Sequence, residues 1–216
     1  MAATRTGAGG WAIIQTASGN APAATIEPAE MKPVVIESRD GLSLNSYLTL
    51  PVGVPPRGLP MVLYVHGGPW ARDVWGYSST PQWLANRGYA VLQVNYRGSG
   101  GYGQAFQDLG HGEWGGKMQD DLTDVTKWAI AQGYADPERI CIYGASYGGY
   151  AALMSAVREP DLYRCTVSIA GVSDLKALAS DDSRFYGGRK AVNRILGTDT
   201  DELRAGSPLR SPEKIK

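Results

Sequence analysis

One short stretch constrains this chain more than any other: a buried strand that turns sharply into a buried helix. Four apolar residues, Ile140 to Tyr143, run without a polar break, which is typical of a strand covered on both faces. Gly144-Ala-Ser-Tyr-Gly148 follows, and residues 150–157 predict an almost wholly apolar helix. In this context a G-x-S-x-G pattern predicts a strained turn that exposes the hydroxyl of Ser146 at the carboxyl edge of a sheet. A Gly/Ser-rich loop without chemical function is the alternative, and the flanking strand and helix disfavour it.

The rest of the chain alternates apolar strands with helices. Asp40-Gly41 is a strong turn signal, so residues 33–38 and 42–50 around it predict a β-hairpin. The other predicted elements, in chain order, are a strand at 61–65, a helix starting at Thr80-Pro81, a strand at 90–94, a helix at about 117–132, a turn at Asp136-Pro137 and a buried strand at 165–170. Unbroken apolar strands separated by helices predict an α/β fold whose mostly parallel sheet has helices on both faces.

Two segments carry weaker signals. Residues 1–30 are rich in Ala, Gly and Thr, and we expect a poorly ordered lead-in or the remnant of a preceding domain, with a short strand at Trp11–Ile14. Three carboxylates, Asp120, Asp121 and Asp124, lie near the start of the 117–132 helix, where they suit its dipole. We interpret them as a solvated helix face rather than a carboxylate site.

The overall composition excludes several classes of function. Lys plus Arg equals Asp plus Glu at 21 each, so the chain offers no electrostatic footprint for nucleic acid or an anionic membrane. No apolar stretch is long enough to span a bilayer, and the N-terminus lacks the continuous apolar region of a secretory signal. These features favour a cytoplasmic protein that binds neither nucleic acid nor membrane, and they leave its oligomeric state open.

Neither a metal nor a cofactor is predicted. The chain has only two histidines, His66 and His111, and no C-x-x-C motif, so a zinc site is not expected. The glycines of residues 98–103 do not form G-x-G-x-x-G at a helix start, which argues against a dinucleotide site. Cys141 and Cys165 each lie in an apolar run and are expected to be buried free thiols; a disulfide is conceivable if their strands are neighbours.

The serine turn implies acyl-transfer chemistry. Such chemistry needs a nucleophile, a base, a group that orients the base, and donors for the oxyanion. Ser146 is the candidate nucleophile, and the backbone N–H of Tyr147 is one candidate donor. His66-Gly-Gly-Pro69 ends the 61–65 strand and fits the loop that supplies the second donor. Because His66 precedes the serine, we favour a structural role in that loop over the role of general base; His111 is expected in a surface loop.

The chain carries six short motifs, which are, in order, Ser38-Arg-Asp-Gly-Leu42, Tyr47-Leu-Thr-Leu-Pro51, His66-Gly-Gly-Pro-Trp70, Asn95-Tyr-Arg-Gly-Ser99, Gly112-Glu-Trp-Gly115 and Gly144-Ala-Ser-Tyr-Gly-Gly-Tyr150. Together and in this order they resemble the catalytic domain of the prolyl oligopeptidase (S9) family, and most closely its acylaminoacyl-peptidase and dipeptidyl-peptidase-like branches. The resemblance implies an α/β-hydrolase fold and hydrolysis of a peptide or acyl-amino bond through an acyl-enzyme on Ser146. It also implies an oxyanion hole made by the N–H groups of Gly68 and Tyr147, and a substrate pocket that includes Val172, Leu175 and Leu178.

The sequence departs from the family pattern after the serine. In the family the triad Asp and His follow the nucleophile on later loops, but no histidine follows Ser146 here. Residues 207–216 resemble the segment that precedes the strand leading to the triad Asp. We therefore interpret residues 31–216 as an incomplete catalytic domain that lacks its last strands, and we expect the isolated chain to be inactive and prone to aggregate.

Two other functions fit the same motifs less well. An esterase or lipase could share the fold, but Gly-Gly-Pro-Trp70 and the Asn95–Ser99 loop favour a peptidase. A non-catalytic α/β-hydrolase-like binding protein is the second alternative. It would have no need of a strained serine turn.

Overall fold

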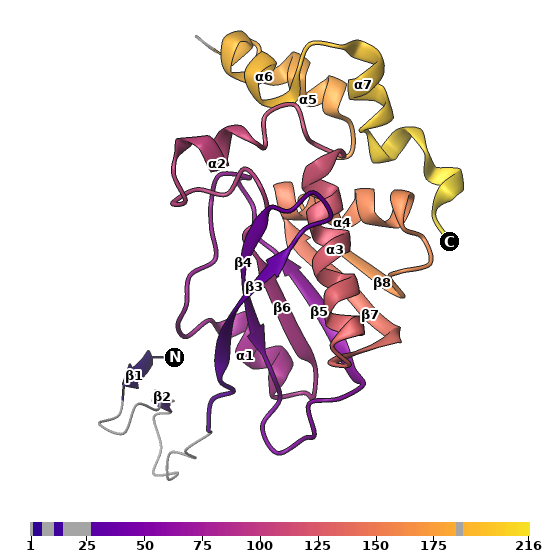
Figure 1. Cartoon of the computed structure of the whole chain (residues 1–216). Coiled ribbons are helices and arrows are strands. Elements are labelled where there is room, and N and C mark those ends of the chain that lie inside the picture. The colour runs from indigo at the N-terminus through magenta and orange to yellow at the C-terminus, as the bar shows by residue number, and fades with distance from the viewer. Residues whose placement is uncertain (1, 6–10, 15–26, 185–187) are drawn as a thin grey trace, which may run out of the picture.

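The computed structural model describes residues 2–5, 11–14, 27–184 and 188–216. Its central feature is a six-stranded sheet with the strand order β3-β4-β6-β5-β7-β8, and this confirms the predicted α/β class (Figure 1). The strands are β3 (Met31–Glu37), β4 (Ser43–Thr49), β5 (Leu59–Val65), β6 (Ala90–Val94), β7 (Ala135–Ala145) and β8 (Cys165–Ile169).

The first two strands of the sheet form the predicted hairpin. β3 pairs antiparallel with β4, with Val34 opposite Ser46. The turn between them closes through the N–H of Ser38, which donates to the carbonyl of Leu42 at 2.9 Å. Gly41 has a φ of 82°, a conformation that favours glycine. β4 also pairs antiparallel with β6, so the hairpin attaches directly to the parallel part of the sheet.

Four strands, β6, β5, β7 and β8, pair in parallel. β6 covers the predicted residues 90–94, and all five of its residues are buried. β7 begins earlier than predicted, because Ala135 already pairs with Leu59 of β5. The expected turn at Asp136-Pro137 therefore lies within a strand, where Asp136 Oδ1 accepts a hydrogen bond from the N–H of Glu138 at 2.9 Å.

Helices cover both faces of the sheet. α3 (Lys117–Ala131) and α4 (Tyr147–Arg158) lie over one face, where Leu122 and Tyr150 join β-strand side chains such as Leu63 and Ile142 in the core. α1 (Ser79–Ala85) lies on the other face (Figure 1). It begins two residues before Pro81, the predicted first helical residue, with Ser78 at its N-cap position.

A group of short helices after β8 was not predicted. They are α5 (Leu175–Asp182), α6 (Gly188–Leu196), α7 (Thr200–Ala205) and the 3₁₀ turns η1 (Pro208–Arg210) and η2 (Pro212–Lys214). They lie near the short helix α2 (Gln104–Asp108), at the end of the sheet where the parallel strands finish (Figure 1). Tyr150 of α4 ties this group to the core, because its hydroxyl donates to the carbonyl of Gly206 at 2.8 Å.

β8 differs from the buried strand that its sequence predicts. The strand itself is confirmed, but Val167 is 45% exposed and Ile169 is 48% exposed. The reason is its position: β8 is at the edge of the sheet, and the face that carries these side chains has no helix over it among the described residues.

The prediction of buried free thiols is wrong. Cys141 of β7 lies directly opposite Cys165 of β8, with their Cα atoms 4.6 Å apart, and the two form a disulfide. Cys165 is exposed and Cys141 half-buried. Disulfides are more usual in oxidising compartments than in the cytoplasm, so this bond does not support the cytoplasmic prediction.

The N-terminal segment is described only in part. β2 (Trp11–Ile14) confirms the predicted short strand and pairs antiparallel with β1 (Ala2–Arg5). The rest of the predicted lead-in, residues 6–10 and 15–26, lies outside the described residues.

Candidate active site

The strand-to-helix turn around Ser146 has the strained geometry that its glycines predict. Ser146 is exposed and has φ 57° and ψ −119°, a region that L-residues rarely occupy. A Cβ atom on Gly144 would collide with the backbone of Gly148, and one on Gly148 would collide with the carbonyl oxygen of Val65. Only glycine fits at these two positions, so the turn holds Ser146 at the start of α4.

The loop that follows β5 passes beside the serine. We call residues 66–73 the His66 loop. A Cβ atom on Gly67 would lie 3.4 Å from Ser146 Cβ. Gly68 has a φ of 118°. No acceptor is recorded within the described residues for the N–H groups of Gly68 and Tyr147; Tyr147 begins α4, where helix N–H groups point outward without partners.

His66 belongs to the framework of this loop. Its ring is buried and stacks on Tyr96, with 4.4 Å between the ring centroids. Nδ1 lies 2.9 Å from the carbonyl oxygen of Gly67, and Nε2 lies 3.0 Å from Ser99 Oγ. The carbonyl can only accept, so Nδ1 carries the proton and Nε2 accepts from Ser99. Burial lowers the pKa of His66 to about 4, so the ring is neutral at pH 7 and both nitrogens are engaged away from Ser146.

A second loop holds the His66 loop in place. We call residues 95–103, between β6 and α2, the Arg97 loop. The side chain of Asn95 accepts from the N–H of Asp73 at 2.7 Å and donates to the carbonyl of Asp73 at 3.1 Å. The N–H of Gly100 donates to the carbonyl of Ala71 at 3.0 Å. Ser99 and Tyr96 also join the two loops, through the bond to the His66 ring and through the Tyr96 hydroxyl, which donates to the carbonyl of His66 at 2.9 Å.

The Arg97 loop is itself anchored by a buried ion pair. Arg97 donates to both carboxylate oxygens of Asp121 on α3, at 2.7 and 2.9 Å, and to both oxygens of Asp40 in the hairpin turn. Asp121 is fully buried, so the prediction of a solvated carboxylate face is wrong for it. The helix places Asp121 inward, toward an arginine supplied by a distant loop. Hydrogen bonds from Arg97 hold the pKa of Asp40 well below its usual range.

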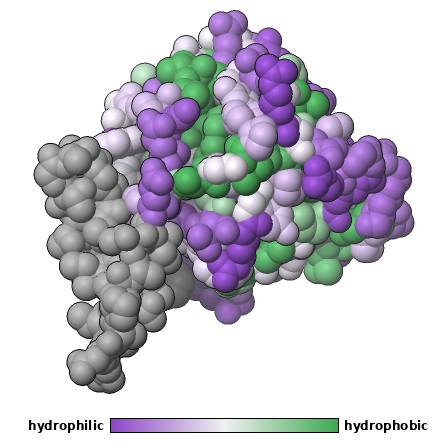
Figure 2. Space-filling view, turned by 90° about the horizontal axis from the view of Figure 1, so that it is seen from below, coloured by the Kyte–Doolittle hydropathy of each residue, from purple (hydrophilic) through white to green (hydrophobic). Residues whose placement is uncertain are grey.

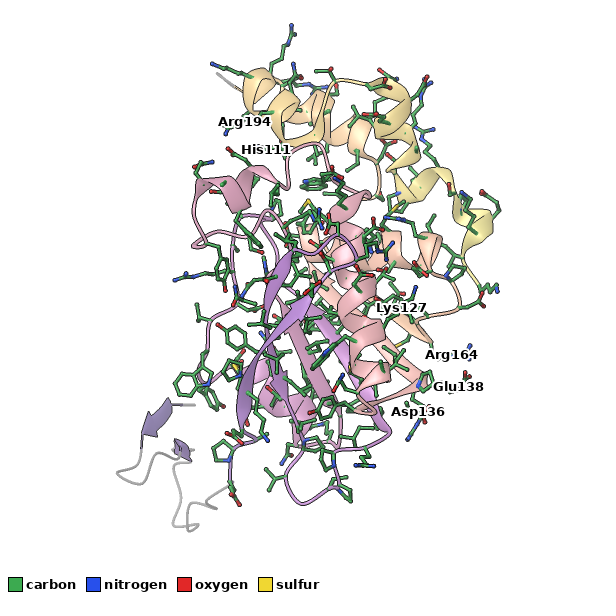
Figure 3. The ribbon with its side chains drawn as sticks, viewed as in Figure 1. His111, Lys127, Asp136, Glu138, Arg164 and Arg194 are labelled. Atoms are coloured by element: carbon green, nitrogen blue, oxygen red, sulfur yellow. A yellow bond between two sulfur atoms is a disulfide. The ribbon has the colours of Figure 1, made fainter. Side chains whose placement is uncertain are left out.

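His111 has the surface position that was predicted. Its Nδ1 lies 3.4 Å from Asp108 Oδ1, and Arg194 of α6 donates to the same carboxylate at 2.9 Å. Figure 3 shows His111 and Arg194 close together near α2. The histidine thus contributes to a surface ion cluster, and its recorded partner is Asp108 and not Ser146.

The three predicted pocket residues lie on the segment that follows β8. Val172 and Leu178 are half-buried against the core. Leu175 is 2% exposed, and its N–H donates to Ser207 Oγ at 2.9 Å. A hollow lined by Met154, Arg158 and Lys214 is elsewhere, at the C-terminal end of α4. It therefore lies at the opposite end of that helix from Ser146.

Among the described residues, no cluster of three or more His, Cys, Asp or Glu side chains could hold a metal ion, and none of the described helices is long and apolar enough to cross a membrane. Figure 2 views the end of the sheet where the parallel strands begin, and there apolar and charged areas alternate over the surface.

Sequence reasoning missed the residues that hold the two loops together. Ser99 and Asn95 were noticed only as parts of a motif, and Asp73 and Gln93 were not noticed at all. The single available signal was the position of a polar residue, Gln93, within the otherwise apolar run 90–94. A polar residue in a buried strand implies a partner, and here the partner is Asp73.

Comparison with known proteins agrees with the geometry. The model of the prolyl oligopeptidase family, Peptidase_S9, matches residues 75–214. Dipeptidyl aminopeptidase BIII of Pseudoxanthomonas mexicana is 46% identical over 85% of this chain. Dipeptidyl peptidase family member 6 of Caenorhabditis elegans is 36% identical over 82%. The chain spans less than a third of each relative, 29% and 28% of their lengths.

Solved structures show the same relationship. A crystal structure of puromycin hydrolase superimposes with a TM-score of 0.80 at 27% identity, over 88% of this chain and 30% of that one. Acylaminoacyl peptidase of Pyrococcus horikoshii gives 0.78 at 25% identity, over 88% and 31%. With its serine turn, flanking loops and sheet order, the chain belongs to the prolyl oligopeptidase (S9) family of serine peptidases.

Proposed function

We propose that residues 31–216 form part of the catalytic domain of a peptidase that hydrolyses peptide or acyl-aminoacyl bonds through an acyl-enzyme on Ser146. The strained conformation of Ser146, beside the backbone of Gly67, is the observation that carries this proposal. Strain at a non-glycine residue persists only where surrounding structure imposes it, and it concentrates at functional sites. The names of the two dipeptidyl-peptidase relatives favour release of dipeptides as the first activity to assay.

The oxyanion donors in this proposal are the N–H groups of Gly68 and Tyr147. Both groups lack a recorded acceptor within the described residues, and the loop of Gly68 runs beside the serine. Preorganised donors of this kind stabilise the tetrahedral intermediate. In well-studied cases each donor lowers the activation free energy by about 3 kcal/mol. Val172, Leu175 and Leu178 are proposed to shape the substrate pocket, with the buried Leu175 supporting the other two.

The 216-residue chain is proposed to be inactive by itself. His66 has both ring nitrogens engaged, and the recorded partner of His111 is Asp108. Neither therefore serves Ser146 as a base, and a serine without a base is a weak nucleophile. The base and its acid would come from the remainder of a longer protein.

A fluorophosphonate probe that reacts with activated serines tests this function. We expect the full-length protein to be labelled at Ser146, and both the Ser146→Ala variant and the isolated 216-residue chain to remain unlabelled. Labelling of the isolated chain would mean that a residue within it activates the serine. Failure of the full-length protein to label would overturn the catalytic proposal itself.

A further inference from the structure

Gln93, which is buried, and Asp73, which is half-buried, form a polar pair that the hydrolysis reaction does not require. Gln93 is 2% exposed and lies in the middle of β6. Its Nε2 donates to Asp73 Oδ1 at 2.7 Å. The other oxygen of each group, Asp73 Oδ2 and Gln93 Oε1, is buried and has no hydrogen-bond partner in the described part of the chain. Each such buried unpaired acceptor carries a free-energy cost.

The two unpaired atoms cannot satisfy each other as they stand, because an ionised carboxylate and an amide oxygen both only accept hydrogen bonds. A single proton on Asp73 gives both unpaired atoms a hydrogen bond. A protonated Asp73 Oδ2 donates to Gln93 Oε1 while Gln93 Nε2 donates to Asp73 Oδ1, so that the carboxyl and the amide close a ring with two hydrogen bonds. We propose that Asp73 is a protonated positioning residue, and that this acid–amide pair holds the His66 loop against β6.

The surroundings of Asp73 favour the neutral form. Burial raises the pKa of Asp73 to about 7. The titratable groups that face it are Tyr64 of β5 and Tyr96 of the Arg97 loop. Burial raises the pKa of both phenols above 10, so neither carries a charge near neutral pH. No cation contributes to the pKa shift of Asp73, and an ionised carboxylate there would lack a counter-charge.

Asp73 lies in the same loop as the residues beside Ser146. Asn95 hydrogen-bonds to both the N–H and the carbonyl of Asp73, and the His66 loop, to which Asp73 belongs, also places Gly67 beside Ser146. Loss of the proton leaves a buried charge that the loop can relieve only by moving outward into water. Raising the pH therefore loosens the loop that carries Gly68. This catalytic consequence rests on the proposed function, whereas the protonation of Asp73 does not.

Infrared spectroscopy of the 216-residue chain tests the protonation directly. The difference between wild type and Asp73→Asn should contain the C=O stretch of a protonated carboxylic acid at pH 6. In the wild type that band should disappear as the pH rises, with a midpoint near pH 7. Asp73→Asn should lack the band, and this separates Asp73 from Asp121, the other carboxyl whose pKa is raised by burial. Absence of the band at pH 6 overturns the proposal.

A pH profile of probe labelling in the full-length protein tests the positioning role. The side-chain amide of the Asp73→Asn variant can make both hydrogen bonds at every pH, because it donates and accepts without titrating. The ratio of the Asp73→Asn rate to the wild-type rate should therefore rise about tenfold between pH 6 and pH 8, because the protonated fraction of a group with a pKa of about 7 falls about tenfold over that range. A constant ratio for Asp73→Asn refutes the positioning role.

The exposed Asp161→Asn, which loses only a surface contact with Lys216, is the matched control and should keep a constant ratio to wild type across the same pH range. If no protein labels, the proposed function fails, and the infrared band still decides the protonation.

Discussion

The guanidinium group of Arg97 meets the fully buried carboxylate of Asp121 through two hydrogen bonds, of 2.7 and 2.9 Å. Arg97 is itself almost wholly buried. The pair joins the Arg97 loop to α3, and the loop in turn holds the His66 loop. A framework of charged and polar contacts thus lies behind the candidate active site, and its energetic importance can be measured.

Removing the side chain of Arg97 should destabilise the folded chain strongly. Arg97→Leu leaves Asp121 buried without a counter-charge, and breaking such a pair costs about 3 to 5 kcal/mol of the free energy of unfolding. Arg204→Leu is the matched control, because Arg204 is exposed and pairs at 3.3 Å with Asp201, which is exposed on the same helix. Its loss should cost about 1 kcal/mol or less. Urea unfolding followed by circular dichroism measures both, and equal losses would contradict this account.

The close packing behind the serine turn predicts an effect of one methyl group. In Gly148→Ala the added Cβ meets the backbone carbonyl of Val65, which cannot move without distorting β5. We expect a loss of about 3 kcal/mol, at the upper end of overpacking effects. The control Ala177→Ser also adds a single heavy atom, but at an exposed position of α5, so that variant should unfold close to wild type. Thermal unfolding of the two variants gives the comparison.

Strain at the nucleophile predicts a stabilising substitution. Ser146→Gly removes the side chain from a conformation with a positive φ, so the folded chain should gain about 1 kcal/mol. Labelling of the full-length protein should be abolished at the same time. Ser180→Gly, in the exposed part of α5, should instead lose about 0.5 to 1 kcal/mol, the cost of glycine in a helix. A destabilised Ser146→Gly would show that the turn is not strained.

Burial of His66 predicts a loss of stability in acid. The pKa of His66 is about 4 in the folded chain, below the value of about 6.5 that an exposed histidine has. The unfolded chain therefore takes up a proton first as the pH falls, and the titration of His66 alone should cost the folded state about 2 kcal/mol between about pH 7.5 and pH 5.

His66→Asn should abolish this acid-side loss. The opposite trend expected from Asp73, whose raised pKa destabilises the folded state as the pH rises from about 4 to about 7, is common to both proteins and cancels in the comparison. His111→Asn keeps His66 and should keep the loss. Urea unfolding at a series of pH values measures the three curves, and parallel curves for wild type and His66→Asn would be inconsistent with a buried neutral ring.

The disulfide predicts sensitivity to reductant. Cys141 and Cys165 are separated by 24 positions, and a cross-link closing a loop of that length stabilises by about 3 kcal/mol in the chain-entropy description. The double variant Cys141→Ser/Cys165→Ser should lose that amount, and reductant should produce the same loss in wild type. Reductant added to the double variant is the control and should change nothing. Wild type that is indifferent to reductant would mean that the bond contributes no stability.

Local patterns in the sequence predicted most of the sheet. The apolar run 90–94 coincides with β6, and Asp40-Gly41 marks the hairpin turn. The helices after β8 were missed, although Asp174 and Asp199 cap α5 and α7 with their side chains and so provided N-cap signals. The strand at Asp136-Pro137 was mistaken for a turn, because pairing with β5 overrides the local preference of that dipeptide.

The sequence predicts the turn that carries Ser146, but it does not predict the contacts that hold the surrounding loops in place. The glycines around Ser146 identify the turn, since only a close backbone approach needs them there. The partners of Asp121, Asp73 and Cys141 are distant in the sequence, and no local pattern states which strands and loops become neighbours. These contacts follow from the order of strands in the sheet, and so the burial of Asp121 and the disulfide required the structure.

The backbone of Ser146 is attached to the edge of the sheet as well as to its centre. Its N–H donates to the carbonyl of Ile169, the last residue of β8, at 2.9 Å. Edge strands with exposed side chains open at low free-energy cost, and amide hydrogen exchange records such opening. The amide of Ser146 should therefore exchange together with those of β8, and the amides of the central strands β5 and β6 should exchange more slowly. A partner that buried the exposed side chains of β8 would therefore also reduce local opening at Ser146.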